Sequence, residues 1–82
     1  MLTIDYEPSF LKTIQRIRDP VTKEKIKKQI QKIINEPEIG KPMRYARKGT
    51  REVYVSPFRV SYLYVKDEER LVLLDLYHKD EQ

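Results

Sequence analysis

The sequence contains no cysteine, one histidine and only two glycines among its 82 residues. The absence of cysteine excludes a disulfide framework and a cysteine zinc site, which is typical of proteins in the reducing cytoplasm. The two glycines are isolated, so no glycine-rich phosphate loop is present. No apolar run approaches the roughly 20 residues that span a membrane, and the stretch from Met1 to Tyr6 is too short for a signal peptide. We therefore expect a cytoplasmic protein that is not bound to a membrane.

Metal ligands are equally scarce. The acidic clusters, Asp67 to Glu69 and Asp80 to Glu81, lack the spacing of a calcium-binding loop. We interpret these acids as solvated charges. No Ser/His/Asp combination is singled out by its spacing, and we expect neither a metal nor a small-molecule cofactor.

Basic residues are abundant, with a formal net charge of +4 and a pI near 9.4. They are unevenly distributed. The segment from Ile39 to Arg51 has five basic residues and no acidic one: Lys41, Arg44, Arg47, Lys48 and Arg51. A cluster of this kind predicts affinity for a polyanion such as a nucleic acid.

The length predicts a single small domain over residues 1–82, with room for two packed layers. Apolar residues alternate in residues 2–6, which predicts a half-buried strand. Helical spacing of apolar residues follows over residues 8–18 and again from Pro20 to about Asn35. Asp19 and Pro20 form the boundary, because Asp is a favourable N-cap and Pro a favourable first helical residue. The short link predicts an antiparallel helical hairpin.

The second half of the sequence is typical of β structure. After a turn at residues 36–42, we expect a short strand at Met43–Arg47, then strands at Glu52–Val55, Phe58–Val65 and Arg70–Tyr77. The last two are apolar on both sides, which indicates interior strands. The predicted fold is α+β, in the order β-α-α-β-β-β, with the helical hairpin on one face of a small, mostly antiparallel sheet. Polar residues in the interior strands need a structural or functional explanation where they lie on the open face. The residues concerned are Arg59, Ser61 and Asp75.

Basic residues alternate with aromatic residues in several segments, and this pattern is typical of proteins that bind single-stranded RNA. Single-stranded RNA is bound by cations that contact phosphates and by flat groups on which bases stack. Candidate RNA-binding residues are Arg44, Arg47, Lys48 and Tyr77, with Tyr45 in the same basic segment. Tyr62 and Tyr64 alternate with Val60, and we interpret them as core residues.

Two residues, Arg59 and His78, have competing interpretations. Arg59 is either a phosphate ligand or half of a structural ion pair with Asp75 or Glu52, since an unpaired buried cation is costly. His78 is either a residue of a frayed tail or a general acid, because it is the side chain that titrates nearest neutral pH. Lys79 beside it is a candidate for stabilising a pentavalent phosphorane.

These residues resemble the RelE/ParE toxin superfamily along nearly the whole chain. Three segments carry the resemblance: Gly49 to Val55, Phe58 to Tyr62, and the apolar strand from Leu71 to Leu76 with its tail from Tyr77 to Gln82. They match a Gly-x-Arg-Glu strand, an aromatic–arginine strand and an apolar strand with a basic tail. The preceding helix and the Pro-x-x-Gly-x-Pro segment, from Pro37 to Pro42, are similar to the RelE and HigB branches.

The resemblance implies a toxin of a type II toxin–antitoxin system that cleaves mRNA in the ribosomal A site and has a cognate antitoxin as partner. It also implies chemistry without metal, in which the 2′-hydroxyl attacks the adjacent phosphate and basic residues stabilise the developing charge. By position, four residues take catalytic roles: Arg51, Arg59, His78 and Lys79. Arg59 corresponds to the arginine at the scissile phosphate, and His78 to the general acid of some branches.

Several positions depart from the family pattern. Lys79 stands where arginine is common, so a point charge replaces a bidentate fork. Glu52 and Tyr54 stand where some members have lysines, and no general base is evident in that strand. Tyr77 is a candidate replacement for a tyrosine that some branches carry at the C-terminus. Two alternatives therefore stay open, a ParE-like inhibitor of DNA gyrase and a catalytically inactive RNA-binding relative.

Overall fold

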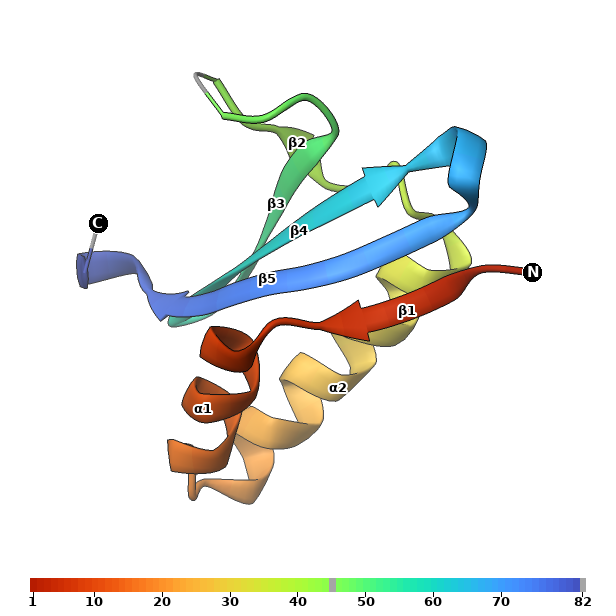
Figure 1. The fold of residues 1–82 in the computed structure, drawn as a ribbon. Helices are drawn as coiled ribbons and strands as arrows, with labels where there is room; N and C mark the ends of the chain where they lie inside the picture. Colours follow the sequence, from red (N-terminus) through yellow and green to blue (C-terminus); the bar gives the residue numbers. More distant parts are fainter. Residues whose placement is uncertain (45, 82) are drawn as a thin grey trace.

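The computed structural model describes residues 1–44 and 46–81 (Figure 1). Tyr45 and Gln82, which belong to the sequence motifs above, lie outside these residues. The helices are α1 (Pro8–Arg16) and α2 (Pro20–Asn35), and the strands are β1 (Thr3–Tyr6), β2 (Lys41–Pro42), β3 (Thr50–Val55), β4 (Phe58–Val65) and β5 (Arg70–His78). Short 3-10 turns follow β4 (Lys66–Glu68) and β5 (Lys79–Glu81).

All of these strands join one sheet, in the order β1-β5-β4-β3-β2. β1 runs parallel to β5, and every other neighbouring pair is antiparallel. The two helices form a hairpin on one face of the sheet, below it in Figure 1. The predicted α+β class and the interior positions of β4 and β5 are confirmed, and the two-residue β2 is added to the predicted order.

The boundary between the helices follows from local chemistry. The Asp19 carboxylate accepts hydrogen bonds from the Val21 backbone N–H at 3.2 Å and from Thr22 Oγ1 at 2.7 Å, which caps α2 as predicted. α1 ends at Arg16, two residues before its predicted end, because Ile17 is already extended, as the reversal into α2 requires. Within the described ranges, no helix is both long and apolar enough to cross a membrane.

The core lies between the helical hairpin and the sheet. Phe10, Ile26 and Ile33 of the helices pack against the helix-facing side of β3, β4 and β5. Tyr62 is fully buried there, and Tyr64 packs against the same cluster, so the interpretation of both as core residues is confirmed. The other sheet face carries Glu52, Arg59, Ser61, Asp75 and Tyr77.

A register shift between β4 and β5 decides which residues reach each face. Ser61 lies opposite Asp75, but Tyr62 lies opposite Leu73, so Leu74 is an extra residue in β5. Before this bulge the odd-numbered residues of β5 face the helices, and after it the even-numbered ones do. Asp75 and Tyr77 consequently lie on the face away from the helices.

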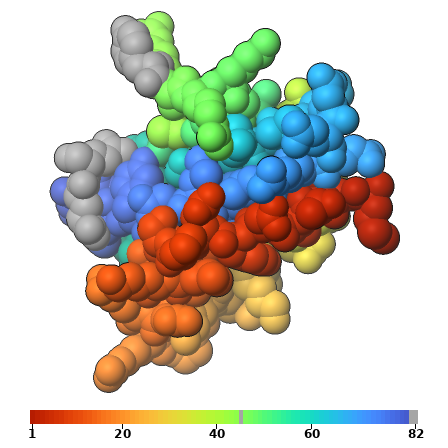
Figure 2. Space-filling view, in the orientation of Figure 1, coloured from red at the N-terminus to blue at the C-terminus, as the bar shows by residue number. Residues whose placement is uncertain are grey.

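The predicted strand at Met43–Arg47 is wrong. The strand that pairs with β3 at this edge is β2, in which Lys41 lies opposite Glu52. The Met43 N–H then donates to the Thr50 carbonyl at 3.1 Å, and the described residues between them form turns and no strand. Gly49 completes the reversal with a φ of 90°. The resulting loop, green in Figures 1 and 2, projects away from the body of the molecule.

Candidate functional site

An open groove crosses the sheet at the end where β4 begins. Its volume is about 1100 Å³. Residues from α1, β2 and the three long strands line it: Thr13, Lys41, Pro42, Met43, Arg44, Glu52, Arg59, Asp75, Leu76 and Tyr77. It therefore contains three of the predicted site residues, namely Arg59, Arg44 and Tyr77.

A three-residue cluster occupies the groove. Arg59 Nη1 donates to Glu52 Oε1 at 2.6 Å, in a pair that is both a hydrogen bond and an ion pair. The Tyr77 hydroxyl donates to the other carboxylate oxygen, Oε2. The Arg59 guanidinium also lies over the ring of Tyr54, 5.7 Å from its centroid. Strand register brings these groups together, since Arg59 lies opposite Tyr54 on one side and Tyr77 on the other.

The electrostatics of the cluster keep Arg59 charged. The hydrogen bond that Arg59 donates to Glu52 raises the pKa of the Arg59 guanidinium above its ordinary value. Burial opposes this rise, and the negative charge of Glu52 adds a smaller increase. The side chain of Glu52 is 14% exposed and that of Arg59 is 35% exposed. Arg59 Nε is buried and has no hydrogen-bond partner within the part of the chain described. A buried donor without an acceptor is uncommon in folded proteins and is often found at functional sites.

The groove has a basic rim. Lys41 and Arg44 are both exposed and enter from the same edge, on β2 and directly after it. The acids of the groove are Glu52 and Asp75, and Asp75 accepts a hydrogen bond from the Leu76 N–H at 2.8 Å. Three cations therefore face two carboxylates, one of which is already paired with Arg59. Across residues 1–44 and 46–81, no group of three or more His, Asp or Glu side chains is placed to hold a metal ion.

His78 lies on the opposite face of β5 from Tyr77 and Arg59. It pairs with Phe58, and the two rings meet edge to face with centroids 5.6 Å apart. Its Nδ1 accepts a hydrogen bond from the Asp80 N–H at 3.3 Å. The structure does not bring His78 together with Arg59 in the groove.

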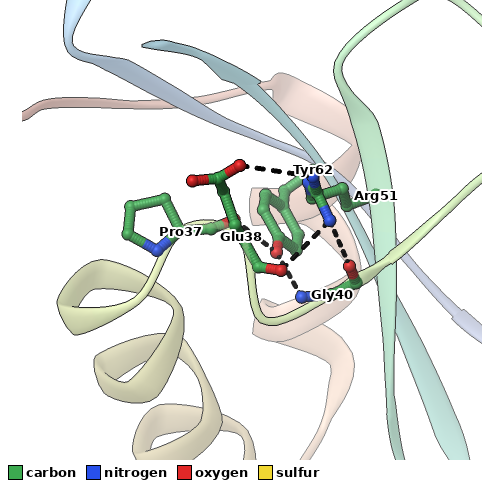
Figure 3. Close-up of polar contacts among 5 residues, drawn as sticks. All are labelled: Pro37, Glu38, Gly40, Arg51 and Tyr62. Carbon is green, nitrogen blue, oxygen red and sulfur yellow. Dashed lines mark hydrogen bonds and ion pairs between the residues drawn. The ribbon is translucent and has the colours of Figure 1, made fainter.

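Arg51 also lies away from the groove, on the helix-facing side of β3 (Figure 3). Its Nη1 donates to the carbonyls of Glu38 at 3.0 Å and Gly40 at 2.7 Å, and its guanidinium forms an ion pair of 3.7 Å with the Glu38 carboxylate. Beside it, the Tyr62 hydroxyl donates to the Pro37 carbonyl at 2.7 Å and accepts from the Gly40 N–H at 2.8 Å. Burial raises the pKa of the Tyr62 hydroxyl. We call these five residues the loop clamp, because they attach the segment after α2 to the sheet.

The remaining predicted residues lie at the margins. Lys79 is exposed and follows β5, where its N–H donates to the Pro57 carbonyl at 3.0 Å. Arg47 and Lys48 are exposed in the loop before β3 and line a separate, smaller pocket with Arg70. Of the predicted residues, the groove thus combines Arg59, Arg44 and Tyr77.

The sequence matches a family profile over residues 4–82, that of the ParE toxin of the type II toxin–antitoxin system parDE. The chain belongs to this family. This toxin is therefore a member of the RelE/ParE superfamily, and the resemblance drawn from its sequence is confirmed. No curated protein matches it significantly by sequence.

Solved structures share the fold of this toxin. The intact RelBE toxin–antitoxin complex of E. coli matches with a TM-score of 0.81 and 16% identity, over 95% of this chain and 96% of that chain. The DinJ–YafQ complex of E. coli matches with a TM-score of 0.78 and 19% identity, over 99% and 97% of the two chains. The RelBE2 complex of Mycobacterium tuberculosis matches with a TM-score of 0.75 and 18% identity, over 95% of this chain and 98% of that chain.

Glu52 is the residue of this ParE-family toxin that sequence reasoning missed as a site residue. We considered it only as an ion-pair partner or as a departure from a lysine pattern. A signal was available, because Glu52 alternates with Val53 and Val55, which pack on the helix-facing side of the strand. A charged residue at that position in a strand next to β4 points to the same face as Arg59.

Proposed function

We propose that this toxin is an endoribonuclease that cleaves mRNA by acid/base chemistry without a metal, with the ribosomal A site as the expected place of cleavage. The observation that carries the proposal is the cluster in the groove, where the Glu52 carboxylate is held between Arg59 and the Tyr77 hydroxyl. A proton acceptor beside a cation is what in-line attack by a 2′-hydroxyl requires.

In the proposed reaction, Glu52 accepts the proton of the 2′-hydroxyl, whose oxygen forms a bond to the adjacent phosphorus. Arg59 stabilises the charge of the pentavalent phosphorane. The bond from phosphorus to the 5′-oxygen breaks, and we assign Tyr77 as the donor that protonates this oxygen. The products are a 2′,3′-cyclic phosphate and a 5′-hydroxyl. Tyr77 regains its proton from Glu52, to which it is hydrogen bonded.

The other basic residues have supporting roles in this proposal. Lys41 and Arg44 on the rim contact phosphates that flank the cleaved one, and Lys79 contributes positive charge from the end of β5. Arg47 and Lys48 extend the basic surface along the loop before β3. Arg51 and His78 receive no direct role at the phosphate, because they lie on the other face of the sheet.

We further propose that a cognate antitoxin binds and neutralises this protein. Support comes from the family match to a toxin of a type II system and from neighbours solved as toxin–antitoxin complexes. The gene adjacent to this one is expected to encode that partner.

Variants of Arg59 and Lys79 test the proposal. Expression of the wild-type chain should arrest growth, and Arg59→Ala or Lys79→Ala should abolish the arrest, because each removes charge at the phosphate. Lys32→Ala, which removes an exposed charge from α2, is the matched control and should remain toxic. Circular dichroism of the purified variants checks that the fold is intact. Full toxicity of both Arg59→Ala and Lys79→Ala would contradict the proposed site.

Inhibition of DNA gyrase is a second candidate, favoured by the match to the ParE family in particular. Primer extension on cellular mRNA after induction separates the two. Discrete cleavages within translated mRNA support the nuclease. DNA damage without mRNA cleavage, and toxicity that survives Arg59→Ala, support gyrase inhibition.

A further inference from the structure

A second, smaller groove lies between the helical hairpin and the end of the sheet. Its volume is about 410 Å³. Its lining comes from α1, the start of α2 and the turn between β3 and β4: Thr13, Arg16, Ile17, Arg18, Asp19, Thr22, Pro57, Phe58 and Leu76. None of the roles proposed above uses it.

The two grooves are continuous over one edge of the sheet. Thr13 and Leu76 line both of them. β1 pairs with β5 only from Arg70 to Leu73, so the rest of this edge of β5 is free of a partner strand. α1 runs along that free edge, where Ser9 Oγ donates to the Leu74 carbonyl at 2.8 Å. A flexible chain lying in the first groove can therefore pass over Thr13 and Leu76 into the second.

The charges of the second groove favour an anion. Arg16 and Arg18 are exposed, and neither forms an ion pair within residues 1–44 and 46–81. The one acid in the lining, Asp19, uses both carboxylate oxygens to cap α2. Two guanidinium groups are thus available beside a carboxylate that is already hydrogen bonded.

The floor of the second groove is apolar and partly aromatic. Ile17, Pro57 and Leu76 line the groove with Phe58, whose ring is half-buried and makes an edge-to-face contact with that of His78. A ring beside free cations is the combination that holds a nucleotide of a single strand, since the base stacks while its phosphate is neutralised.

We propose that the second groove binds single-stranded RNA continuous with the strand in the first groove. Arg16 and Arg18 contact its phosphates, and Phe58 provides the surface on which a base stacks. This inference rests on the proposed function, and it places nucleotides flanking the cleaved phosphate around the end of β5. It gives Arg16 and Arg18 a role in binding and none in the chemical step.

The dependence of affinity on RNA length tests the inference. Fully 2′-O-methylated RNA cannot be cleaved by 2′-hydroxyl attack, and oligomers of about 3 and about 10 nucleotides distinguish one occupied groove from two. Fluorescence anisotropy with the wild-type chain should show tighter binding of the longer oligomer. The Arg16→Ala/Arg18→Ala double variant should lose about tenfold in affinity for the longer oligomer only, with a shallower salt dependence.

Two further variants make the result specific. Lys12→Ala/Lys32→Ala removes the same charge from the helices outside both grooves and should keep the gain with length. Arg16→Lys/Arg18→Lys should keep most of the increase in RNA affinity with oligomer length, because these lysines carry the same charge as the arginines. Equal losses for the alanine variants of Arg16/Arg18 and Lys12/Lys32, or a wild type without any gain with length, would overturn this inference alone. A wild type that binds neither oligomer would overturn this inference, and a wild type that also cleaves no cellular mRNA after induction would overturn the proposed function with it.

Discussion

Arg59 and Glu52 face each other across β4 and β3, with Nη1 and Oε1 2.6 Å apart. The same carboxylate accepts a hydrogen bond from Tyr77 on the other neighbouring strand. Three strands thus contribute one side chain each to a single polar contact in an open groove. Because Glu52 neutralises Arg59 when the groove is empty, a phosphate that binds Arg59 must compete with this carboxylate.

Glu52→Gln separates binding from chemistry. The amide keeps the size of the side chain but is no longer a charged proton acceptor, so cleavage should fall by about 10²- to 10⁴-fold. RNA affinity should stay the same or rise, because Arg59 is no longer neutralised. Single-turnover cleavage and anisotropy measure the two effects, with Glu68→Gln as an exposed control. Unchanged cleavage would remove Glu52 from the mechanism.

Tyr77 and His78 can be ranked by substitution, because they lie on opposite faces of β5. Tyr77→Phe removes the hydroxyl bound to Glu52 and should lower single-turnover cleavage by about 10²-fold, within the range of general acid–base effects. His78→Gln should leave cleavage within about threefold of the wild type, since that side chain is outside the groove. The reverse order would restore His78 as the general acid and would imply a different path for the RNA.

The loop clamp should contribute measurably to stability. Tyr62→Phe leaves the Gly40 N–H and the Pro37 carbonyl without their partner, which should lower the free energy of unfolding by about 1–3 kcal/mol. Gly40→Ala should cost a similar amount, about 1–3 kcal/mol, because the added Cβ would lie 2.5 Å from the Tyr62 hydroxyl oxygen. Urea unfolding measures both changes.

The double variant sharpens this test. In Tyr62→Phe/Gly40→Ala the new methyl group still lies 2.8 Å from Cε1 and 2.9 Å from Cζ of the ring. Both single changes disturb the same hydrogen bond between Gly40 and Tyr62, so the combined loss should be smaller than the sum of the single losses. Strict additivity would show that the two residues do not interact. Tyr64→Phe is the matched control, since it removes a tyrosine hydroxyl of the same strand from outside the clamp.

Asp19 predicts a specific dependence of stability on pH. The hydrogen bonds from Thr22 and from the Val21 N–H lower the pKa of its carboxyl below the ordinary 3.8. The folded state therefore binds this proton less tightly than the unfolded state does, and the stabilisation is complete above 3.8 and lost as the pH falls through the folded value. Asp19→Ala should lower the melting temperature at neutral pH, and the difference should narrow below 3.8. This account would be contradicted if the difference in melting temperature between the wild type and Asp19→Ala stayed constant in acid. It would also be contradicted if the exposed Asp67→Ala variant showed the same difference.

The elements of this fold follow closely from local chemistry in the sequence. The Asp19–Pro20 boundary, both helices and the interior positions of β4 and β5 could be predicted, because capping and apolar periodicity are encoded within a few residues. The two-residue β2 could not, since it exists only through its pairing with β3. Arg51 illustrates the same limit: the sequence places a cation beside the groove, but strand alternation turns it towards the loop clamp.

The site could be predicted only in part, for a related reason. Arg59 was identifiable as a cation in an interior strand, and Glu52 was one of two partners that the sequence left open. Choosing between Glu52 and Asp75 requires the register of two strand pairs, which depends on packing across the whole sheet. The roles of Tyr77 and His78 depend on that register as well.

The extra residue at Leu74 acts on everything that follows it in β5. If the strand were regular from Arg70 onwards, Leu76 would lie opposite Arg59, Asp75 and Tyr77 would face the helices, and His78 would turn to the face of the groove beyond Phe58. The extra residue therefore places a tyrosine opposite Arg59, and not the leucine that precedes it. A change in the number of residues in this strand can alter which residue lies opposite Arg59 without any substitution there. A change of phase in one strand is sufficient to present the neighbouring side chain instead.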